Sequence, residues 1–520
     1  MLGTSFAEWL FIRASIIIFR YTPLLWSAGL GLTYLVLPLS THRFTLISVL
    51  SVLLLSEACF FAFLYYPYQR RLKQEVKYPD SLVTKERREL FEKCIDNVPS
   101  LETYLQWWFL GASVESIRRE NVREFLCWAF FDQRYEELKE NDLDDDGTST
   151  LDELEKYIEL IERRLGRNLG EGRGNVESLR LTFDDISTTY RGLAWYTIIF
   201  VVDQATHLAM RWHGFQYYAR PRTEAIRVFP PRPLEVLSQQ RSPARGLSYW
   251  YRPHESKTHT PILFFHGIGV GLWTYVRFLA DIYRISKRGG QGGTGIIAIE
   301  LLPISFRLTD PPLEKTMFLQ QMTAIVDYHH WQEFTITSHS YGSVLITHAL
   351  HQPDLSKRIA SVVLIDPVTI MLHLPNVAYN FTRRKPKRAN EWQLWYFAST
   401  DPGVAHCLGR CFFWRENILW KEELGTASSP DGSTTIREPR RGVKASVFLS
   451  GQDIIVDAPA IAQYLNSGET IEPGLGGSAD GVDVHTFPHL DHAQVFDDSS
   501  SCERVVQAIL LLAETGDLTA

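Results

Sequence analysis

The sequence is poor in cysteine, with six scattered in 520 residues: Cys59, Cys94, Cys127, Cys407, Cys411 and Cys502. None has the spacing of a metal site. Cys407 and Cys411 are four residues apart, on one face if helical, but no second pair or histidine is in register with them. This pattern argues against a cysteine-based metal centre and suits a reducing compartment.

Positive charge is not in excess either. The formal net charge is −7, so nothing in the overall balance indicates nucleic acid as a partner. A length of 520 residues is enough for two or three domains, and a hydrophobic content of 45% allows a large core. We expect no cofactor, and the sequence indicates neither an organelle nor an oligomeric state.

Charge is almost missing from two stretches near the N-terminus. Residues 21–39 carry none, and residues 44–66 carry only Glu57. Each is about as long as the roughly 20 residues that cross a bilayer. No small-residue cleavage site follows the first stretch, which argues against a signal peptide. We therefore predict a membrane anchor over residues 1–77, with transmembrane helices at about 21–39 and 44–66.

The segments around these stretches set the expected orientation. Residues 6–19 are apolar but contain Glu8 and Arg13, which indicates an interfacial segment. Positive charge flanks the outer ends of the hairpin, and the loop between the spans has one arginine, Arg43. This asymmetry favours cytosolic ends, and hence a cytosolic main body. The flanking cations are Arg13, Arg20, Arg70, Arg71, Lys73 and Lys77.

Residues 78–240 are predicted to be mainly helical. The apolar run 192–202 ends at Asp203, too short for a third span, so we expect a buried helix there. The basic, proline-rich run 220–233 marks the end of the region.

One stretch in this region matches a calcium-binding loop. Asp142, Asp144, Asp146 and Glu153 stand at ligand positions, and Gly147 at the turn. Ser149 replaces the usual aliphatic residue, and no second loop accompanies the first. A solvated acidic loop is the alternative.

From about residue 245 to 520, short β-rich runs alternate with helical patterns. Such alternation predicts a mostly parallel sheet with helices on both faces. The expected strands are 247–251, 261–265, 295–301, 334–337, 360–365, 445–449 and 482–487.

The run 338–342 (SHSYG) lies between a strand and a helix of small and apolar residues. A serine at the apex of a sharp strand-to-helix turn, with small residues two positions before and after, is typical of a nucleophile elbow. Ser338 stands where glycine is usual. The alternative is a tight βα turn with no chemistry.

Two later positions favour the elbow. Asp453 follows the strand 445–449, and His492 follows the strand 482–487, so the order is serine, acid, histidine. A neutral serine needs an adjacent base, and the base needs a carboxylate to fix its tautomer. Rivals remain: Asp366 or Asp457 as the acid, and His489 as the base.

These motifs resemble the α/β-hydrolase family over roughly residues 245 to 515, and the whole arrangement is similar to its fungal membrane-anchored members. The residues that carry the resemblance are 266–269 (HGIG), 338–342, 451–453 (GQD) and 491–492 (DH). It implies Ser340 as nucleophile, His492 as base and then acid, and Asp453 as the orienting carboxylate. It also implies an oxyanion hole from the N–H groups of Ile268 and Tyr341.

Other residues have expected roles around the site. Four belong to the two motifs that shape it: His266, Gly267, Gly269 and Gly342. His339, inside the elbow, is expected to face the substrate pocket. A cap is predicted over about residues 370–443, because the connection far exceeds an ordinary loop.

The cap decides the expected substrate. Residues 392–420 hold eight aromatics, which favour an apolar acyl or alkyl group. The basic run 383–388 suits anionic lipid headgroups or is a solvated cluster. We expect a membrane-anchored serine hydrolase of an ester, thioester or amide in a lipid-like molecule, with the bilayer as partner. Acyl transfer and a non-catalytic binding module are the alternatives.

Overall fold

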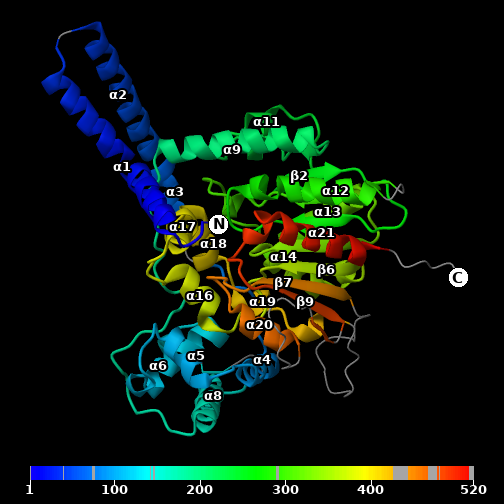
Figure 1. Cartoon of the computed structure of the whole chain (residues 1–520). Coiled ribbons are helices and arrows are strands. Elements are labelled where there is room, and N and C mark those ends of the chain that lie inside the picture. Colours follow the sequence, from blue (N-terminus) through cyan, green and yellow to red (C-terminus); the bar gives the residue numbers. More distant parts are fainter. Residues whose placement is uncertain are drawn as a thin grey trace.

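A nine-stranded sheet forms the centre of the protein (Figure 1), seen in a computed structural model that describes residues 2–38, 40–72, 76–140, 142–143, 147–288, 292–425, 443–466, 477–479 and 481–514. The strand order is β1-β2-β4-β3-β5-β6-β7-β9-β8. Strands β4, β3, β5, β6, β7 and β9 run parallel, while β1, β2 and β8 are antiparallel to their neighbours at the two edges. The strands are β1 Gln216–Tyr218, β2 Tyr249–Arg252, β3 Ile262–Phe265, β4 Ile296–Ile299, β5 Phe334–His339, β6 Ile359–Ile365, β7 Lys444–Ser450, β8 Gly477–Ala479 and β9 Val482–Phe487.

Helices cover both faces of this sheet, because its central strands are apolar on both sides. On one face, α12 (Val276–Arg288) and α21 (Ser499–Ala513) pack on Phe264 and Ile365. On the other, α13 (Lys315–Tyr328) and α14 (Gly342–His351) pack on Phe265 and Leu364. Two further helices of the domain are α15 (Pro353–Ser356) and α20 (Ala458–Leu465).

The strand order and the two helical layers are those of the α/β-hydrolase fold, so the predicted fold class is confirmed. The sheet begins earlier than residue 245, however. Tyr217 of β1 pairs with Trp250 of β2, which adds an antiparallel strand from the stretch predicted to be helical. Three residues are too few for the alternation that identifies a strand.

The N-terminal helices form a hairpin that projects from the domain (Figure 1). Helix α1 spans Phe6–Val36; α2 (Thr41–Phe60) continues through the π-helical η1 (Phe61–Tyr65) into α3 (Tyr66–Arg71). Both long helices are apolar and long enough to cross a membrane. Arg43 closes the hairpin, since its guanidinium donates to the carbonyls of Tyr34 and Leu37.

Residues 6–19, expected to be an interfacial segment, form the first half of α1 and continue into the first predicted span without a break. Its Ile12 and Ile16 pack against Ala389 and Tyr396 of the cap. The Arg13 guanidinium lies 3.8 Å from the ring centroid of Trp392. One side of this half is therefore covered by protein, while Leu10, Phe11, Ile17 and Ile18 stay exposed.

The helical region packs against the cap. Trp108 Nε1 donates to the carbonyl of His373, and Trp414 Nε1 of the cap donates to the carbonyl of Ala129. The region contains α4 Thr84–Asp96, α5 Leu101–Trp108, η2 Val114–Ser116, α6 Arg119–Leu126, η3 Cys127–Phe131, α7 Tyr135–Glu140, α8 Thr150–Leu165, α9 Leu193–Trp212, α10 Arg222–Ala225 and α11 Pro233–Leu237. The cap contains α16 Pro375–Thr382, α17 Ala389–Gln393, η6 Leu394–Ser399, α18 Pro402–Arg410, α19 Trp414–Asn417 and η7 Lys421–Glu423.

Helix α9 is longer than predicted and only one of its faces is buried. Asp203 on that face forms an ion pair with Arg307 at 2.8 Å. Arg232 forms ion pairs with both Asp203 and Glu300. The proline-rich stretch that carries Arg232 is thus packed into the fold and is no free linker. The opposite face exposes Ile198, Val201, Leu208 and Trp212, so the helix that was expected to be buried is buried on one face only.

The calcium-loop match is only partly within the described residues, since Asp144 and Asp146 lie outside them. Glu153, the expected bidentate ligand, is buried and held by the guanidinium of Arg87 at 2.6 Å. Tyr157 also donates to it. Its carboxylate therefore serves an ion pair inside the helical region.

Candidate active site

Ser340 lies at the apex of the turn between β5 and α14. Its φ of +52° is in the left-handed region, as a strained nucleophile elbow requires. A Cβ on Gly342 would lie 2.5 Å from the carbonyl oxygen of Phe265, and one on Gly267 would lie 2.8 Å from the Cβ of Ser340. Both positions need glycine because strand, loop and helix approach closely. Among the described residues, a Cβ on Gly269 would meet no atom within 4 Å.

The structure brings Ser340, His492 and Asp453 into one hydrogen-bonded row. Ser340 Oγ lies 2.8 Å from His492 Nε2. His492 Nδ1 lies 2.6 Å from a carboxylate oxygen of Asp453. The second oxygen of Asp453 accepts the N–H of Ile455 at 2.7 Å, which holds the carboxylate in place.

The rival residues have other partners. Asp366 accepts hydrogen bonds from the N–H groups of Ser450 and Ala493. Asp457 caps α20 by accepting the N–H of Ala460. His489 is exposed and lines a wide cavity beside the row. Asp453 and His492, and none of these three rivals, are hydrogen-bonded in a row with Ser340.

The electrostatics favour a charged imidazole at rest. Burial lowers the pKa of His492, but the carboxylate of Asp453, helped by Asp366 and Asp491, outweighs it and raises the pKa to about 9. Burial and the nearby Asp453 raise the pKa of Asp366 to about 6. Burial also raises the pKa of Asp491. His492 must therefore lose a proton before it can act as a base.

Two histidines near the row are buried. His266 donates from Nδ1 to the carbonyl of Gly267 and accepts the N–H of Leu301 at Nε2, which fixes the loop after β3. His339 was expected in the substrate pocket, but it lies behind the elbow, 2% exposed, with Nδ1 2.7 Å from the Tyr275 hydroxyl. Burial holds its pKa well below the usual range. In strand β5 successive side chains alternate between faces, which turns His339 away from the cavity.

An apolar cavity opens at Ser340, and both Ile268 and Tyr341 line it. Among the described residues, the N–H groups of Ile268 and Tyr341 have no hydrogen-bond acceptor, so both can donate to a substrate oxygen. Ser340 is 6% exposed. The cavity encloses about 50 Å³, well below the roughly 300 Å³ of usual ligand pockets.

Sequence reasoning missed much of the lining of this cavity. Trp108 and Trp128 reach it from the helical region, beyond the predicted cap. Neither carries a sequence signal for this role, because aromatic residues in helices are usually core. The cap and the loops of the domain add Val368, Leu372, Val377, Ala378, Phe381, Leu408, Phe412, Trp414 and Ile455.

Two groups of side chains among the described residues have the composition of a metal site. One is Asp366, Asp453 and His492, which is the row itself. The other is Asp203, His207 and Glu300, where the buried guanidinium of Arg232 already supplies the positive charge. In both groups, hydrogen bonds and ion pairs explain why the side chains lie close together.

Comparison with known proteins gives remote structural similarities. No family model and no curated protein matches the sequence. A bacterial membrane phospholipase A structure is 10% identical, with a TM-score of 0.36, covering 61% of this chain and 93% of that one. An esterase from Pyrobaculum calidifontis is 12% identical, with a TM-score of 0.37 and coverages of 61% and 92%. An esterase from the fungus Rhizomucor miehei is 14% identical, with a TM-score of 0.33 and coverages of 51% and 77%. The fold assignment rests on the strand order.

Proposed function

We propose that this chain is a membrane-anchored serine hydrolase that cleaves an ester, thioester or amide bond in a lipid-like substrate. The observation that carries the proposal is the row from Ser340 Oγ through His492 to Asp453, with spacings of 2.8 and 2.6 Å, at the apex of a strained turn. A serine held this way beside a base and an orienting carboxylate is suited to acyl transfer.

The proposed reaction has two halves. Neutral His492 takes the hydroxyl proton of Ser340 as Oγ attacks the acyl carbon, and returns that proton to the leaving group as the old bond breaks. Water then attacks the acyl-enzyme, His492 takes its proton, and the proton passes to Ser340 Oγ as the acid leaves. The N–H groups of Ile268 and Tyr341 stabilise the oxyanion, where one donor is typically worth about 100- to 1000-fold in turnover.

The lining of the cavity at Ser340 supports a lipid-like substrate. Trp108, Trp128 and Phe412 make its walls apolar, and such walls favour an acyl chain over a charged group. Apolar walls also exclude water, and water then competes poorly for the acyl-enzyme. The same walls therefore favour a second candidate function, acyl transfer to an alcohol. Product analysis with a long-chain alcohol present separates the two outcomes.

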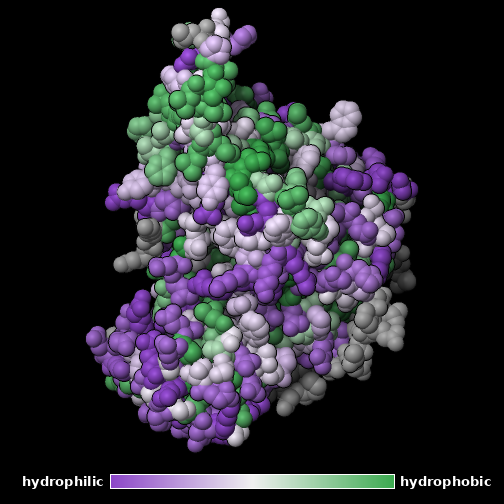
Figure 2. Space-filling model, turned by 60° about the vertical axis from the view of Figure 1, so that its left-hand side comes forward, coloured by the Kyte–Doolittle hydropathy of each residue, from purple (hydrophilic) through white to green (hydrophobic). Residues whose placement is uncertain are grey.

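Membrane anchoring is supported by the hairpin and by the surface next to it. Helix α9 starts at the hairpin base, where Glu57 of α2 accepts the N–H of Leu193 and the hydroxyl of Tyr190. Its exposed apolar stripe, Ile198, Val201, Leu208 and Trp212, follows helical spacing. Figure 2 shows apolar surface on the hairpin and on the part of the domain beside it. We place this stripe at the bilayer surface, with the main body cytosolic because Arg20 and Arg70 flank the outer ends of the two predicted spans.

Labelling with a fluorophosphonate tests the catalytic proposal. Wild-type protein is expected to be modified at Ser340, and Ser340→Ala is expected to resist. Ser338→Ala is the matched control, because Ser338 is buried in β5 two residues before Ser340 and its hydroxyl has no hydrogen-bond partner among the described residues. Folded wild-type protein that stays unlabelled at pH 9 would favour a non-catalytic binding module.

A further inference from the structure

A second cavity lies on the other side of helix α16 from Ser340. It encloses about 1470 Å³, larger than the roughly 300 to 1,000 Å³ of usual ligand pockets. Helix α16 is the wall between the two cavities. Residues on its polar face line the large cavity and residues on its apolar face line the small one: Asn376, Tyr379 and Asn380 against Val377, Ala378 and Phe381.

The wall is completed by the loop after Asp453. Ile454 lines the large cavity and its neighbour Ile455 lines the small one. Asn380 ties helix to loop, because its Nδ2 donates to the carbonyl of Ile455 at 2.9 Å. One helix and one loop thus separate the two spaces, and opening this contact would join them.

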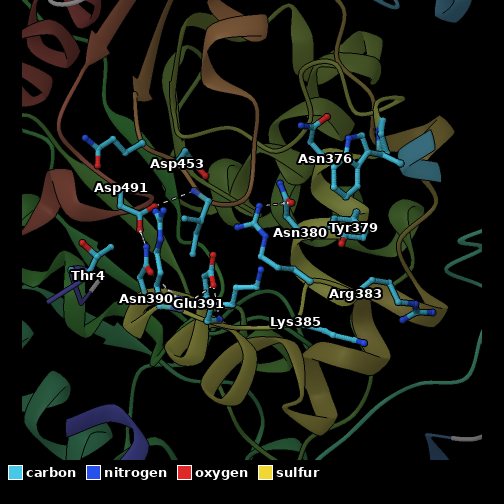
Figure 3. A pocket seen from close by; sticks show the side chains of 18 of the residues that line it. Thr4, Asn376, Tyr379, Asn380, Arg383, Lys385, Asn390, Glu391, Asp453 and Asp491 are labelled. Carbon is cyan, nitrogen blue, oxygen red and sulfur yellow. Dashed lines mark hydrogen bonds between the residues drawn. The ribbon is translucent and has the colours of Figure 1, made fainter. Parts of the chain in front are cut away.

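The large cavity is rich in cations. Its five basic side chains are Arg383, Arg384, Lys385, Lys387 and Arg388. In Figure 3, Arg383 and Lys385 lie at one end of the cavity, with Asp453 and Asp491 at the other.

The carboxylates of the cavity are already engaged. Asp453 holds His492, Asp491 accepts from Asn390 at 2.6 Å, and Glu391 accepts two backbone N–H groups.

Arg384 is the cation best placed to take a ligand. It is half-buried, and within the described part of the chain its guanidinium has one hydrogen-bond partner, the neutral Oδ1 of Asn380, and no ion pair. Arg383, by contrast, is paired with Asp184 at 2.7 Å. A planar guanidinium with free donors matches a phosphate group well.

We propose, on the basis of the proposed hydrolase activity, that the substrate is an amphiphile with a phosphate-bearing headgroup, which Arg384 and the neighbouring lysines bind in the large cavity. The acyl chain occupies the apolar cavity at Ser340. Helix α16 moves to let the acyl ester cross between them when the Asn380–Ile455 hydrogen bond opens. Arg384 donates a hydrogen bond to Asn380, and Asn380 also holds the wall closed through Ile455. Headgroup binding and opening of the wall therefore involve the same side chain, Asn380.

The test compares two esters with the same acyl chain, one with a glycerol phosphate headgroup and one with a glycerol headgroup, on the full chain in detergent micelles. The ratio of kcat/KM for the two is expected to fall about tenfold in Arg384→Gln, the order of one hydrogen bond to a charged group. Arg284→Gln on α12 is the matched control, since its side chain is 61% exposed and pairs with Asp281. Its ratio should equal that of the wild type. An unchanged ratio in Arg384→Gln, with both esters cleaved, overturns the headgroup site and leaves the hydrolase proposal intact.

Binding to Ser340→Ala protein separates the two proposals further, with decyl phosphate as the probe and decyl glucoside as the neutral match. About tenfold weaker binding of decyl phosphate in Ser340→Ala/Arg384→Gln supports the headgroup site even if neither ester is cleaved. Equal binding overturns it. Displacement of decyl phosphate by an equal concentration of inorganic phosphate would identify a free-phosphate site and overturn the amphiphile.

Discussion

The carboxylate of Asp366 accepts the backbone N–H of Ala493 at 2.9 Å, one residue beyond His492. It also accepts the N–H and the hydroxyl of Ser450 at the end of β7. Asp366 therefore joins two loops of the site while Asp453 holds the imidazole. A second negative charge beside His492 has consequences for the pH dependence of the site.

Activity is expected to rise with pH between about 7 and 9. The base must be neutral to accept the serine proton, and the pKa of His492 is about 9. The fraction of neutral imidazole therefore grows through this range. The pH profile of kcat/KM for a neutral ester measures it, and a flat profile from pH 6 to 9 would contradict the raised pKa.

Asp366→Asn is expected to move this rise to lower pH. The substitution removes a negative charge that favours the protonated imidazole, so the pKa of His492 falls. Asparagine still offers an acceptor to Ala493, but its NH2 group then faces the N–H of Ser450, so folding of the variant is checked by thermal unfolding. The pH profiles of kcat/KM for the variant and the wild type are measured with one ester. If both rise at the same pH, Asp366 does not influence the pKa of His492.

Ser338 and Ser343 are expected to differ in their effect on stability. The Ser338 hydroxyl is buried, with no hydrogen-bond partner among the described residues, so Ser338→Ala should be neutral or stabilise by about 1 kcal/mol. Ser343 Oγ accepts the N–H of Val368 and donates to the carbonyl of Ser340. Ser343→Ala should cost roughly 1–3 kcal/mol because it leaves Val368 unpaired. Thermal unfolding measures both, and equal shifts would refute the difference.

Ala378→Phe is expected to shorten the acyl chain that the enzyme accepts. Ala378 faces the apolar cavity from α16, and a phenyl ring there fills space that a chain would need. The ratio of kcat/KM for octanoyl over acetyl esters should drop by at least about tenfold, the loss of two buried methylene groups. Overpacking is expected to cost about 1–3 kcal/mol, so folding is checked by circular dichroism. A ratio that stays constant would exclude this cavity as the acyl site.

The stripe on α9 is expected to enter the bilayer surface. An environment-sensitive fluorophore at Leu208→Cys or Trp212→Cys, with the exposed Cys59 replaced by alanine, should shift its emission to the blue in vesicles. Lys156→Cys on α8 is the matched control, since α8 lies at the end of the molecule away from the hairpin (Figure 1). Emission like that of the control would mean that water covers the stripe.

Calcium is expected not to bind. Glu153 would have to leave its 2.6 Å ion pair with Arg87, and separating a buried pair costs several kcal/mol. Isothermal titration of the full chain with millimolar calcium should give no binding heat. A saturable signal that is lost in Asp142→Ala would reverse this expectation.

The sequence predicted the class of fold and the meeting of Ser340, Asp453 and His492 at one edge of the sheet. Both depend on local patterns: alternating strands and helices, and residues that directly follow strands. In a parallel sheet the carboxyl ends of strands share an edge, so such residues approach one another without further information. Their catalytic role remains a prediction for the labelling experiment.

The sequence predicted less where distant segments pack. The joining of α1 to the cap depends on Ile12 and Tyr396, almost 400 residues apart. The ion pairs of Arg232 look from sequence like ordinary surface charges. Hydropathy and spacing describe one segment at a time, so they do not show which distant residues Ile12 and Arg232 contact.

The walls of the apolar cavity limit how the chain can be divided. A protein cut before residue 245 would keep Ser340, Asp453 and His492, yet it would lose Trp108, Trp128 and strand β1. Such a fragment would carry its reactive groups in an open, wetted cleft. A fragment that contains the hydrolase fold alone would therefore lack part of the apolar lining next to Ser340, so the helical region and the sheet have to be expressed as one piece.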